Sequence, residues 1–213
     1  MHVVIFGATG FSGKAILKEA LSQNHHVTAL VRNKATIFLH HKNLTVVEGN
    51  VTNRQMVTEV LKNADAVIQC LGVGGKGNAT PTTFLSDVTK IIVEEMEKLQ
   101  IMRLVVMSNV GAGNSIAFYP WFFTKVILPY FMKWLKVIID DKNRMEPIIM
   151  NSNLDWTIVR CPNINNKVAK GNCHATLDGK DLKLSITVED MAKFMVQQLT
   201  DNTYSKQAPS ISN

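Results

Sequence analysis

Three glycines at intervals of three residues follow the first apolar run of the chain, and an amphipathic stretch comes after them. A turn of this kind between a strand and a helix brings the backbone close to a bulky anion, because the glycines permit a tight turn and leave room for a phosphate. The helix N-terminus then offers free N–H groups to the anion. The residues expected at this diphosphate-binding turn are Gly7, Thr9, Gly10, Phe11, Ser12 and Gly13. A purely structural tight turn could contain the same glycines.

An arginine follows the second predicted strand, at a place where dinucleotide-binding domains often have an acidic residue. The strand at residues 27–31 is followed by Arg32, Asn33 and Lys34. An acid here would bind the ribose 2′-hydroxyl of NAD, whereas a guanidinium can bind the 2′-phosphate of NADP. The sequence therefore predicts NADP(H) as the cofactor, with NAD(H) as the alternative. An ordinary surface arginine at a strand end is the competing interpretation.

Short apolar runs alternate with helical stretches along most of the chain, so these residues must be positioned by an α/β fold. The predicted strands are residues 3–6, 27–31, 44–47, 66–71, 104–107 and 156–159. The predicted helices are residues 15–22, 56–61, 84–99, a helix around 142–151, and 187–199. The strands are apolar without alternation, as expected where helices cover both faces. The pattern predicts a doubly wound parallel sheet, a Rossmann fold, in a single domain of residues 1–213.

Composition and charge narrow the classes of partner. The chain has 213 residues, of which 46% are apolar and 19% charged, as in one globular domain. Its net charge of +6 is spread without a run of Lys or Arg, so nucleic acid is not expected as a partner. The three cysteines form no CxxC pair and no metal-ligand spacing, which favours reduced thiols, a cytoplasmic location and no metal site. We recognise no signal peptide at the N-terminus.

Residues 115–139 are rich in aromatic side chains and lie outside the regular alternation of elements. Lys125, Pro120 and Pro129 interrupt the segment, so a membrane span is not expected. We expect a buried helical insertion over the carboxyl edge of the sheet, with an interface-lying or dimer-forming segment as alternatives. The aromatic side chains that could form a flat wall or lid for a planar acceptor, or simply pack in the core, are Tyr119, Trp121, Phe122, Phe123 and Phe131.

The C-terminal part is expected to contribute small elements on the substrate side. Residues 173–187 are predicted to form two short strands around a turn at Asp178 and Gly179. A helix follows, for which Thr187 is the expected N-cap, with Asp190 three residues later.

Several sequence segments together carry a family resemblance. "IFGATGFSG", "VTALVRN", "VVEGNVTN" and "DAVIQCLG" occur in order, followed by "TPTTFLSD", "LDWTIVRCPNI" and "ATLDGK" with "EDMAKFM". The chain resembles the atypical short-chain dehydrogenases/reductases, and among them the flavin reductase/biliverdin-IXβ reductase group. The similarity spans nearly the whole chain and is weakest at residues 115–139. It implies an NADPH-binding fold with a shallow site above the nicotinamide.

The resemblance also implies roles for individual residues. Asn50 and Val51 would lie by the adenine, and Leu71 and Gly72 by the ribose and diphosphate. The residues implied around the nicotinamide are Ser108, Asn109, Cys161, Pro162, Asn163 and Ile164. Lys142 would hold the nicotinamide ribose; alternatively it is a helix-surface lysine paired with Glu146.

The sequence departs from the superfamily's catalytic pattern. Ordinary members use Ser with Tyr-x-x-x-Lys, but the position four residues before Lys142 is Ile138. Asn163 stands where the flavin reductase group has a histidine near its substrate. Without the tyrosine, ketone reduction lacks its proton donor. A flavin or quinone delocalises the incoming charge, so solvent can supply the proton while Ser108 and Asn109 orient the acceptor.

The predicted function is therefore an NADPH-dependent oxidoreductase of flavin reductase type, acting on a small planar substrate such as FMN or a quinone, as a monomer or weak homodimer. The catalytic residues expected are Ser108, Asn109 and Lys142. A non-catalytic NADP(H)-binding redox-sensing regulator is the main alternative. An epimerase or isomerase would need an acid–base pair that we do not find.

Overall fold

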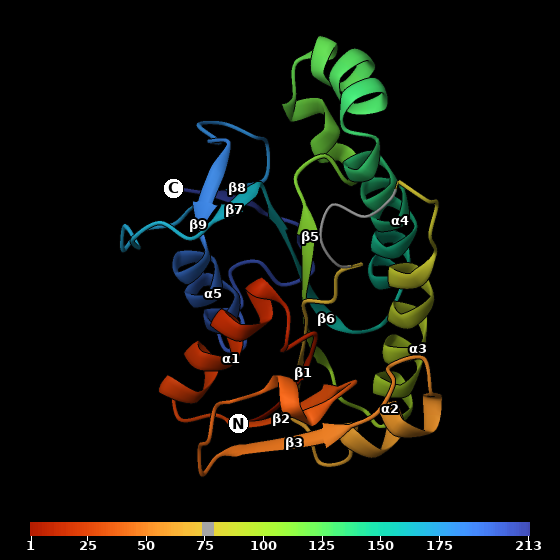
Figure 1. Ribbon diagram of the computed structural model, residues 1–213, viewed down its shortest axis with the longest axis vertical. Helices are drawn as coiled ribbons and strands as arrows, with labels where there is room; N and C mark the ends of the chain where they lie inside the picture. The colour runs from red at the N-terminus through yellow and green to blue at the C-terminus, as the bar shows by residue number, and fades with distance from the viewer. Residues whose placement is uncertain (74–78) are drawn as a thin grey trace.

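Eight strands form the main sheet, in the order β3-β2-β1-β4-β5-β6-β10-β8 (Figure 1). The computed structural model describes residues 1–73 and 79–213. The strands are β1 (His2–Phe6), β2 (His26–Val31), β3 (Leu44–Glu48), β4 (Ala66–Gln69), β5 (Arg103–Asn109), β6 (Asp155–Cys161), β8 (His174–Thr176) and β10 (Ser210–Ser212). All neighbouring pairs are parallel except β10 with β8. The strand order reverses between β1 and β4, and ligands of such sheets bind outside the carboxyl ends of the strands at this point.

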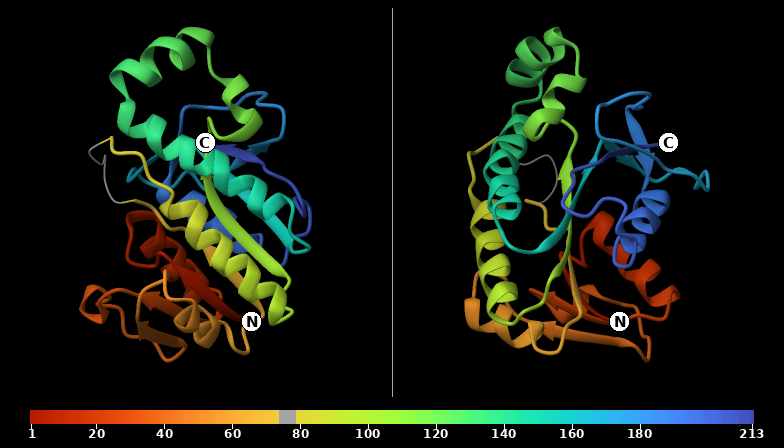
Figure 2. Two further views of the ribbon diagram at one scale, coloured as in Figure 1. Left: turned by 90° about the vertical axis from the view of Figure 1, so that its right-hand side faces the viewer. Right: turned by 180° about the vertical axis from the view of Figure 1, so that it is seen from behind.

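Helices cover both faces of the sheet (Figure 2). The longer helices are α1 (Phe11–Ser22), α2 (Arg54–Leu61), α3 (Phe84–Lys98), α4 (Lys133–Met150) and α5 (Val188–Gln197). On one face α1 packs on α5, and on the other α3 packs on α4. Residues 3–6 of β1 are fully buried and alternate between the two apolar cores, one on each face. The predicted doubly wound fold is confirmed, and it explains why these strands are apolar throughout.

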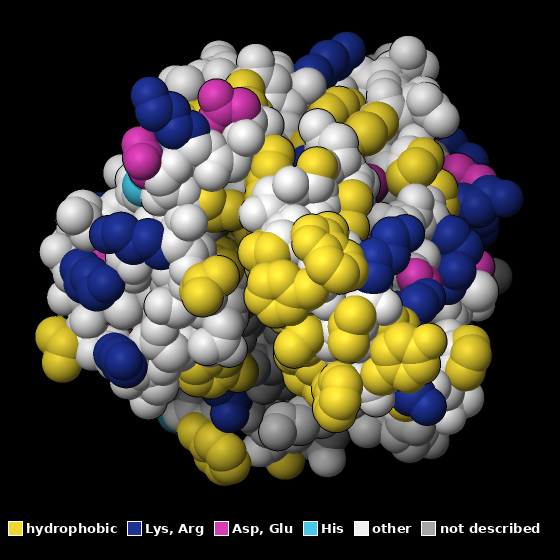
Figure 3. All heavy atoms as spheres, turned by 90° about the horizontal axis from the view of Figure 1, so that it is seen from above, with side chains coloured by type: hydrophobic (Ala, Val, Ile, Leu, Met, Phe, Trp, Pro, Cys, Tyr) yellow, Lys and Arg dark blue, Asp and Glu magenta, His cyan; other side chains and the backbone are white. Residues whose placement is uncertain are grey.

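The predicted insertion differs from expectation in both extent and burial. Helix α4 begins at Lys133, so the irregular part is shorter and consists of η2 (Gly113–Phe118) and the π-helix η3 (Phe123–Phe131). The expectation of a buried insertion is wrong, because Trp121 and Phe131 are 75% and 76% exposed. Seen from above, apolar side chains gather on this end of the molecule beside a hollow (Figure 3). Within the described residues no helix is long and apolar enough to cross a membrane.

The C-terminal strands also pair differently from expectation. The two strands around Asp178 and Gly179 do not form a hairpin: β8 pairs with β10, and β9 (Ser185–Thr187) pairs with β7 (Asn163–Asn165). The turn instead packs against η2. Gly179 lies so close to Phe118 that a Cβ on it would be 2.6 Å from the ring. Strand β10 was not predicted, since its sequence is short and polar. The predicted cap of α5 is confirmed: the Thr187 side chain accepts a hydrogen bond from the Asp190 N–H.

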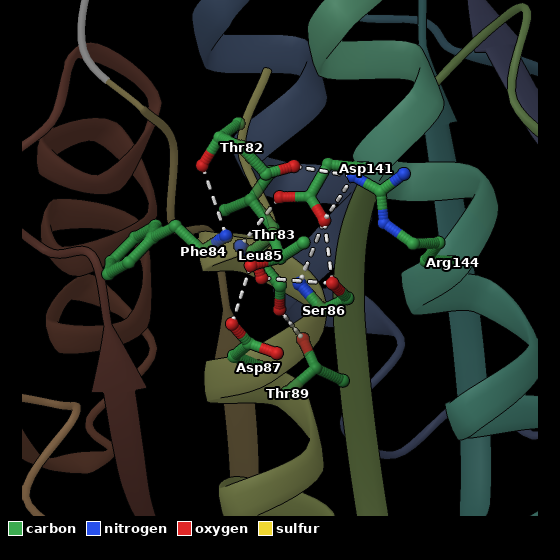
Figure 4. A network of polar contacts seen from close by, with 9 residues as sticks. All are labelled: Thr82, Thr83, Phe84, Leu85, Ser86, Asp87, Thr89, Asp141 and Arg144. Carbon is green, nitrogen blue, oxygen red and sulfur yellow. Dashed lines mark hydrogen bonds and ion pairs between the residues drawn. The ribbon is translucent and has the colours of Figure 1, made fainter. Parts of the chain in front are cut away.

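A carboxylate from α4 caps the N-terminus of α3 (Figure 4). The fully buried Asp141 accepts hydrogen bonds from the N–H groups of Leu85 (2.8 Å) and Ser86 (3.3 Å) and from the Ser86 hydroxyl (2.7 Å). Arg144 pairs with Asp141 and donates to the Thr82 carbonyl oxygen. These bonds join α3 to α4 and fix the helix that carries Lys142 (Figure 4).

Candidate cofactor-binding site

The glycine turn between β1 and α1 contains two glycines that the protein's own packing requires. Gly7 has a φ of +98°, and a Cβ on it would lie 2.7 Å from the Cys70 carbonyl group. A Cβ on Gly13 would lie 2.0 Å from the Gly7 carbonyl oxygen. Both positions therefore exclude side chains for steric reasons, as expected for the tight turn and for close helix–strand packing.

Gly10 differs from the other two glycines because its Cβ position is open. A Cβ there would meet only the Gly7 carbonyl oxygen, at 3.4 Å, and the backbone φ of −70° suits any residue. Packing within the described residues therefore gives no reason for a glycine here, whereas a ligand lying against the backbone would.

The N-terminus of α1 has the character of an anion-binding site. Its N-cap is Gly10, no side chain among the described residues caps it, and its first turn has no acidic residue. The turn carries the exposed Phe11, the buried Ser12 and, just before it, the half-buried Thr9. Unsatisfied N–H groups and the positive end of the helix dipole suit a diphosphate. The residues present thus fit the diphosphate of a dinucleotide.

Other predicted cofactor residues lie after strands at the same edge. Arg32 follows β2 and is exposed, and its side chain has no hydrogen bond or ion pair with any residue that the structure describes. Glu48, at the end of β3, accepts a hydrogen bond from the Lys34 N–H (2.9 Å), so a carboxylate also stands near this loop. The remaining predicted positions here are Asn50 and Gly72, which are exposed, Leu71, which is half-buried, and Val51, which packs in the core.

Ser108 and Asn109 end β5, but their side chains are placed differently. The Ser108 side chain is buried, and its hydroxyl donates a hydrogen bond to Glu146 Oε1 at 2.7 Å. Asn109 is half-buried, and its side chain has no hydrogen bond within the described part of the chain. Asn109 is therefore better placed than Ser108 to bond a ligand at the end of this strand.

A buried ion pair that sequence reasoning missed lies behind Ser108. Arg160 of β6 pairs with Glu146 of α4 (Nη2–Oε2 2.7 Å), and both side chains are 2% exposed. Arg160 also donates to Asn114 Oδ1 at 2.5 Å, which ties η2 to the sheet. The alternative pairing of Lys142 with Glu146 on the helix surface is wrong, because both are buried and Glu146 bonds Arg160. A charged residue inside the apolar strand "WTIVRC" was the signal that could have found this pair.

Lys142 is buried where β4, β5 and β6 end. Its Nζ donates a hydrogen bond to the Met107 carbonyl oxygen at 2.8 Å. Burial lowers the pKa of Lys142 to about 8, although the neighbouring Cys161 and Glu146 oppose the shift. Burial also raises the pKa of the Cys70 and Cys161 thiols to about 12, so both are neutral at physiological pH and unreactive.

The last predicted positions follow β6. Pro162 is buried with Cys161, while Asn163 is exposed and Ile164 half-buried. Asn163 and Ile164 belong to β7, whose pairing with β9 places the small second sheet beside the main one. Apart from Lys142 of α4, the predicted cofactor residues therefore lie at or directly after the carboxyl ends of β1, β2, β3, β4, β5 and β6.

Comparison with known proteins identifies the family. The sequence model of the family described as NAD(P)H-binding matches residues 7–202. The chain belongs to this NAD(P)H-binding family. The match includes the glycine turn and confirms the predicted class of cofactor, and it agrees with the resemblance to atypical short-chain dehydrogenases/reductases.

Two curated relatives show moderate identity. The chain is 29% identical over 161 residues to the photosystem II assembly factor Ycf39 of Synechocystis sp., covering 75% of this chain and 44% of that protein. It thus spans less than half the length of that relative. It is 28% identical over 210 residues to the UPF0659 protein YMR090W of Saccharomyces cerevisiae, covering 93% of this chain and 87% of that protein.

Solved structures share the fold over the full length of the chain. The oxidoreductase ylbE of Lactococcus lactis superposes with a TM-score of 0.82 at 20% identity, over 100% of this chain and 91% of that one. A short-chain dehydrogenase/reductase of Veillonella parvula in complex with NADP gives 0.75 at 18%, over 100% and 94%. The anaerobillin reductase ChuY of Escherichia coli O157:H7 gives 0.79 at 18%, over 100% and 97%.

The contrast between Gly10 and Gly13 can be tested with two substitutions. Gly13→Ala should destabilise the fold by at least about 2 kcal/mol, because its Cβ collides with backbone atoms. Gly10→Ala should leave the melting temperature unchanged but weaken NADPH binding at least about tenfold, because the Cβ occupies the open position. Thermal unfolding and calorimetric titration measure the two effects. If Gly10→Ala bound NADPH as tightly as the wild type does, the cofactor would not lie against the backbone at Gly10.

Burial of Lys142 predicts a pH-dependent contribution to stability. Below pH 8 the lysine is charged in both the folded and unfolded states, and the full cost of burying the charge is present. Between pH 8 and about 10.5 the unfolded chain keeps this lysine's proton while the folded chain loses it, so Lys142 should contribute a rise in stability of up to about 3 kcal/mol. The buried Cys70 and Cys161 thiols act in the opposite direction over this range, but equally in wild type and variant, so the difference between the two proteins isolates the lysine. Lys142→Met should lack this rise. Denaturant unfolding at several pH values checks it, and parallel curves for the two proteins would show that the lysine has an ordinary pKa.

Proposed function

We propose that the protein is an NADPH-dependent oxidoreductase of flavin reductase type, which transfers a hydride to a planar conjugated acceptor such as a flavin or a quinone. The observation that carries the proposal is the open position at Gly10, in front of a helix N-terminus that no side chain of the described residues caps. The family match supports the cofactor class. The anaerobillin reductase and the oxidoreductase ylbE, which share the fold, support the reaction class by analogy.

Different residues of this chain would bind different parts of the cofactor. The N–H groups at the start of α1 would bind the diphosphate, and the exposed guanidinium of Arg32 would bind the 2′-phosphate. Asn109 and the Lys142 ammonium, at the end of β5, would hold the nicotinamide riboside in position. The bound nicotinamide supplies the hydride, and the protein's task is to align the acceptor and exclude competing reactions.

The class of acceptor is inferred from the lack of a strong, available proton donor among the described residues near the end of β5. Ile138 occupies the position of the superfamily's tyrosine, and the Ser108 hydroxyl already bonds Glu146. The Tyr119 ring packs near Gly111, and burial raises its pKa, which makes it a weaker acid. Reduction of a ketone needs a strong donor in the transition state, whereas a flavin or quinone accepts hydride first and takes a proton from water. These features favour the conjugated acceptor.

Turnover is tested by following the NADPH absorbance band with FMN, riboflavin and a soluble quinone, each with and without protein. Protein-dependent loss of the band with any of the three is the expected result. Tight NADPH binding without oxidation of NADPH across the panel would contradict the enzyme.

A second function, that of a non-catalytic NADP(H)-binding redox sensor, is favoured by one observation. The Ser108 hydroxyl and the Lys142 ammonium are both bonded within the protein, so the site holds fewer free polar groups than a reductase would use. A sensor would bind the oxidised and reduced cofactors with different affinities, and calorimetry with NADP⁺ and NADPH would reveal this.

Arg32→Ala should separate the two nicotinamide cofactors. Loss of the charge-assisted bonds to the 2′-phosphate should weaken NADPH binding about ten- to a hundredfold and leave NADH binding unchanged. Lys34→Ala, two residues along the same loop, is the matched control and should affect neither. An equal loss for NADPH and NADH would show that Arg32 does not read the 2′-phosphate, and that NAD(H) is an equal candidate.

A further inference from the structure

Several large apolar side chains of the insertion are exposed close together in the sequence. We call the surface that they form the aromatic surface. Its members and their exposed fractions are Trp121 (75%), Phe122 (50%), Val126 (42%), Tyr130 (71%) and Phe131 (76%). Figure 3 shows apolar side chains gathered on this end of the molecule with Lys and Arg beside them. Contiguous exposed surfaces of this kind mark interaction sites.

The side of the insertion opposite the aromatic surface packs on the domain, and this leaves the aromatic surface facing outward. Leu128 is buried, and the ring of Phe123 packs on that of Tyr119 at 4.6 Å between centroids. Gly111 in turn packs against Tyr119 and Ile139. The segment is therefore amphipathic: one side is fixed to the domain, and the other presents Trp, Tyr and Phe side chains to the surroundings.

The insertion and the start of α4, residues 113–140, carry three lysines and a single acidic residue, Asp140. Residues 98–139 contain no Asp or Glu, while Lys125, Lys133 and Lys136 lie within or next to the aromatic surface. Lys136 is paired with Asp140, and the exposed Lys125 and Lys133 have no ion pair with any described residue. The partner must thus accept apolar side chains and bring negative charge of its own.

We propose that the aromatic surface docks reversibly on a lipid bilayer that contains anionic lipids. Trp and Tyr prefer the boundary between acyl chains and headgroups, and lysines beside them are attracted to anionic headgroups. A second copy of the chain fits less well, because a two-fold contact through this surface would bring Lys125 and Lys133 against the same lysines, and the nearest acid in the sequence, Asp140, already pairs with Lys136. The proposal is independent of turnover.

Co-sedimentation with vesicles tests the proposal on the full chain. The protein should bind vesicles of phosphatidylcholine mixed with phosphatidylglycerol, bind phosphatidylcholine alone much more weakly, and dissociate as salt is raised. Trp121→Ser combined with Phe131→Ser should lower the partition coefficient at least about tenfold. Lys125→Gln and Lys133→Gln should each lower it about fivefold.

Matched control variants distinguish vesicle binding through the aromatic surface from nonspecific adsorption of the protein. Phe38→Ser removes another aromatic side chain, which is 84% exposed, and Lys18→Gln removes an exposed lysine of α1. Both should bind vesicles as the wild type does. Since all these side chains are exposed, every variant should keep its melting temperature, and measuring it excludes misfolding as the cause of lost binding.

Three results would overturn the proposal. One is the absence of sedimentation with anionic vesicles, and another is equal binding to the two kinds of vesicle. The third is a dimer, seen by light scattering, that Trp121→Ser disperses while vesicles bind neither protein. That outcome would assign the aromatic surface to contact between copies of the chain.

Discussion

The close contact between α1 and the end of β1 is the constraint on which the candidate site depends. Gly13 lies so near the Gly7 carbonyl group that no side chain fits between helix and strand. The N-terminus of the helix is therefore held beside the crevice where the strand order reverses between β1 and β4. Packing therefore produces a helix end that no side chain in residues 1–73 or 79–213 caps, and an anion can accept hydrogen bonds from its N–H groups.

Helix α4 is the second support of the site, because it buries three charged side chains against three different elements. Asp141 caps α3, Lys142 bonds the carbonyl group of Met107 in β5, and Glu146 pairs with Arg160 of β6. Buried charges are costly unless they are paired, so each bond restricts how α4 can turn or slide. Asp141 and Glu146 each have an ion pair with an arginine, whereas Lys142 has none with any residue that the structure describes, which agrees with the lowered pKa of its ammonium.

The insertion shows how the same residues can serve packing and contact with the surroundings. Its small inward side, with Leu128 and Phe123, holds it to the domain, while most of its aromatic side chains face outward. In the sequence these two groups are interleaved. A run rich in aromatic residues is compatible with a core helix, a lid or an interacting surface, and only the direction of each side chain distinguishes them.

Sequence alone determined the alternation of the central strands and helices, the doubly wound fold, the glycine turn and the cofactor class, because these depend on local periodicity and on residue types close together in the chain. It missed the short strands β7 and β10 and the first two turns of α4. The tertiary structure decided which polar groups meet. Ser108 and Arg160 are neighbours in the register of β5 and β6, so both reach Glu146. Asp141 caps a helix that begins far before it in the chain, and β10 is a strand only because β6 and β8 flank it. Such contacts join residues distant in sequence, and no local pattern records them.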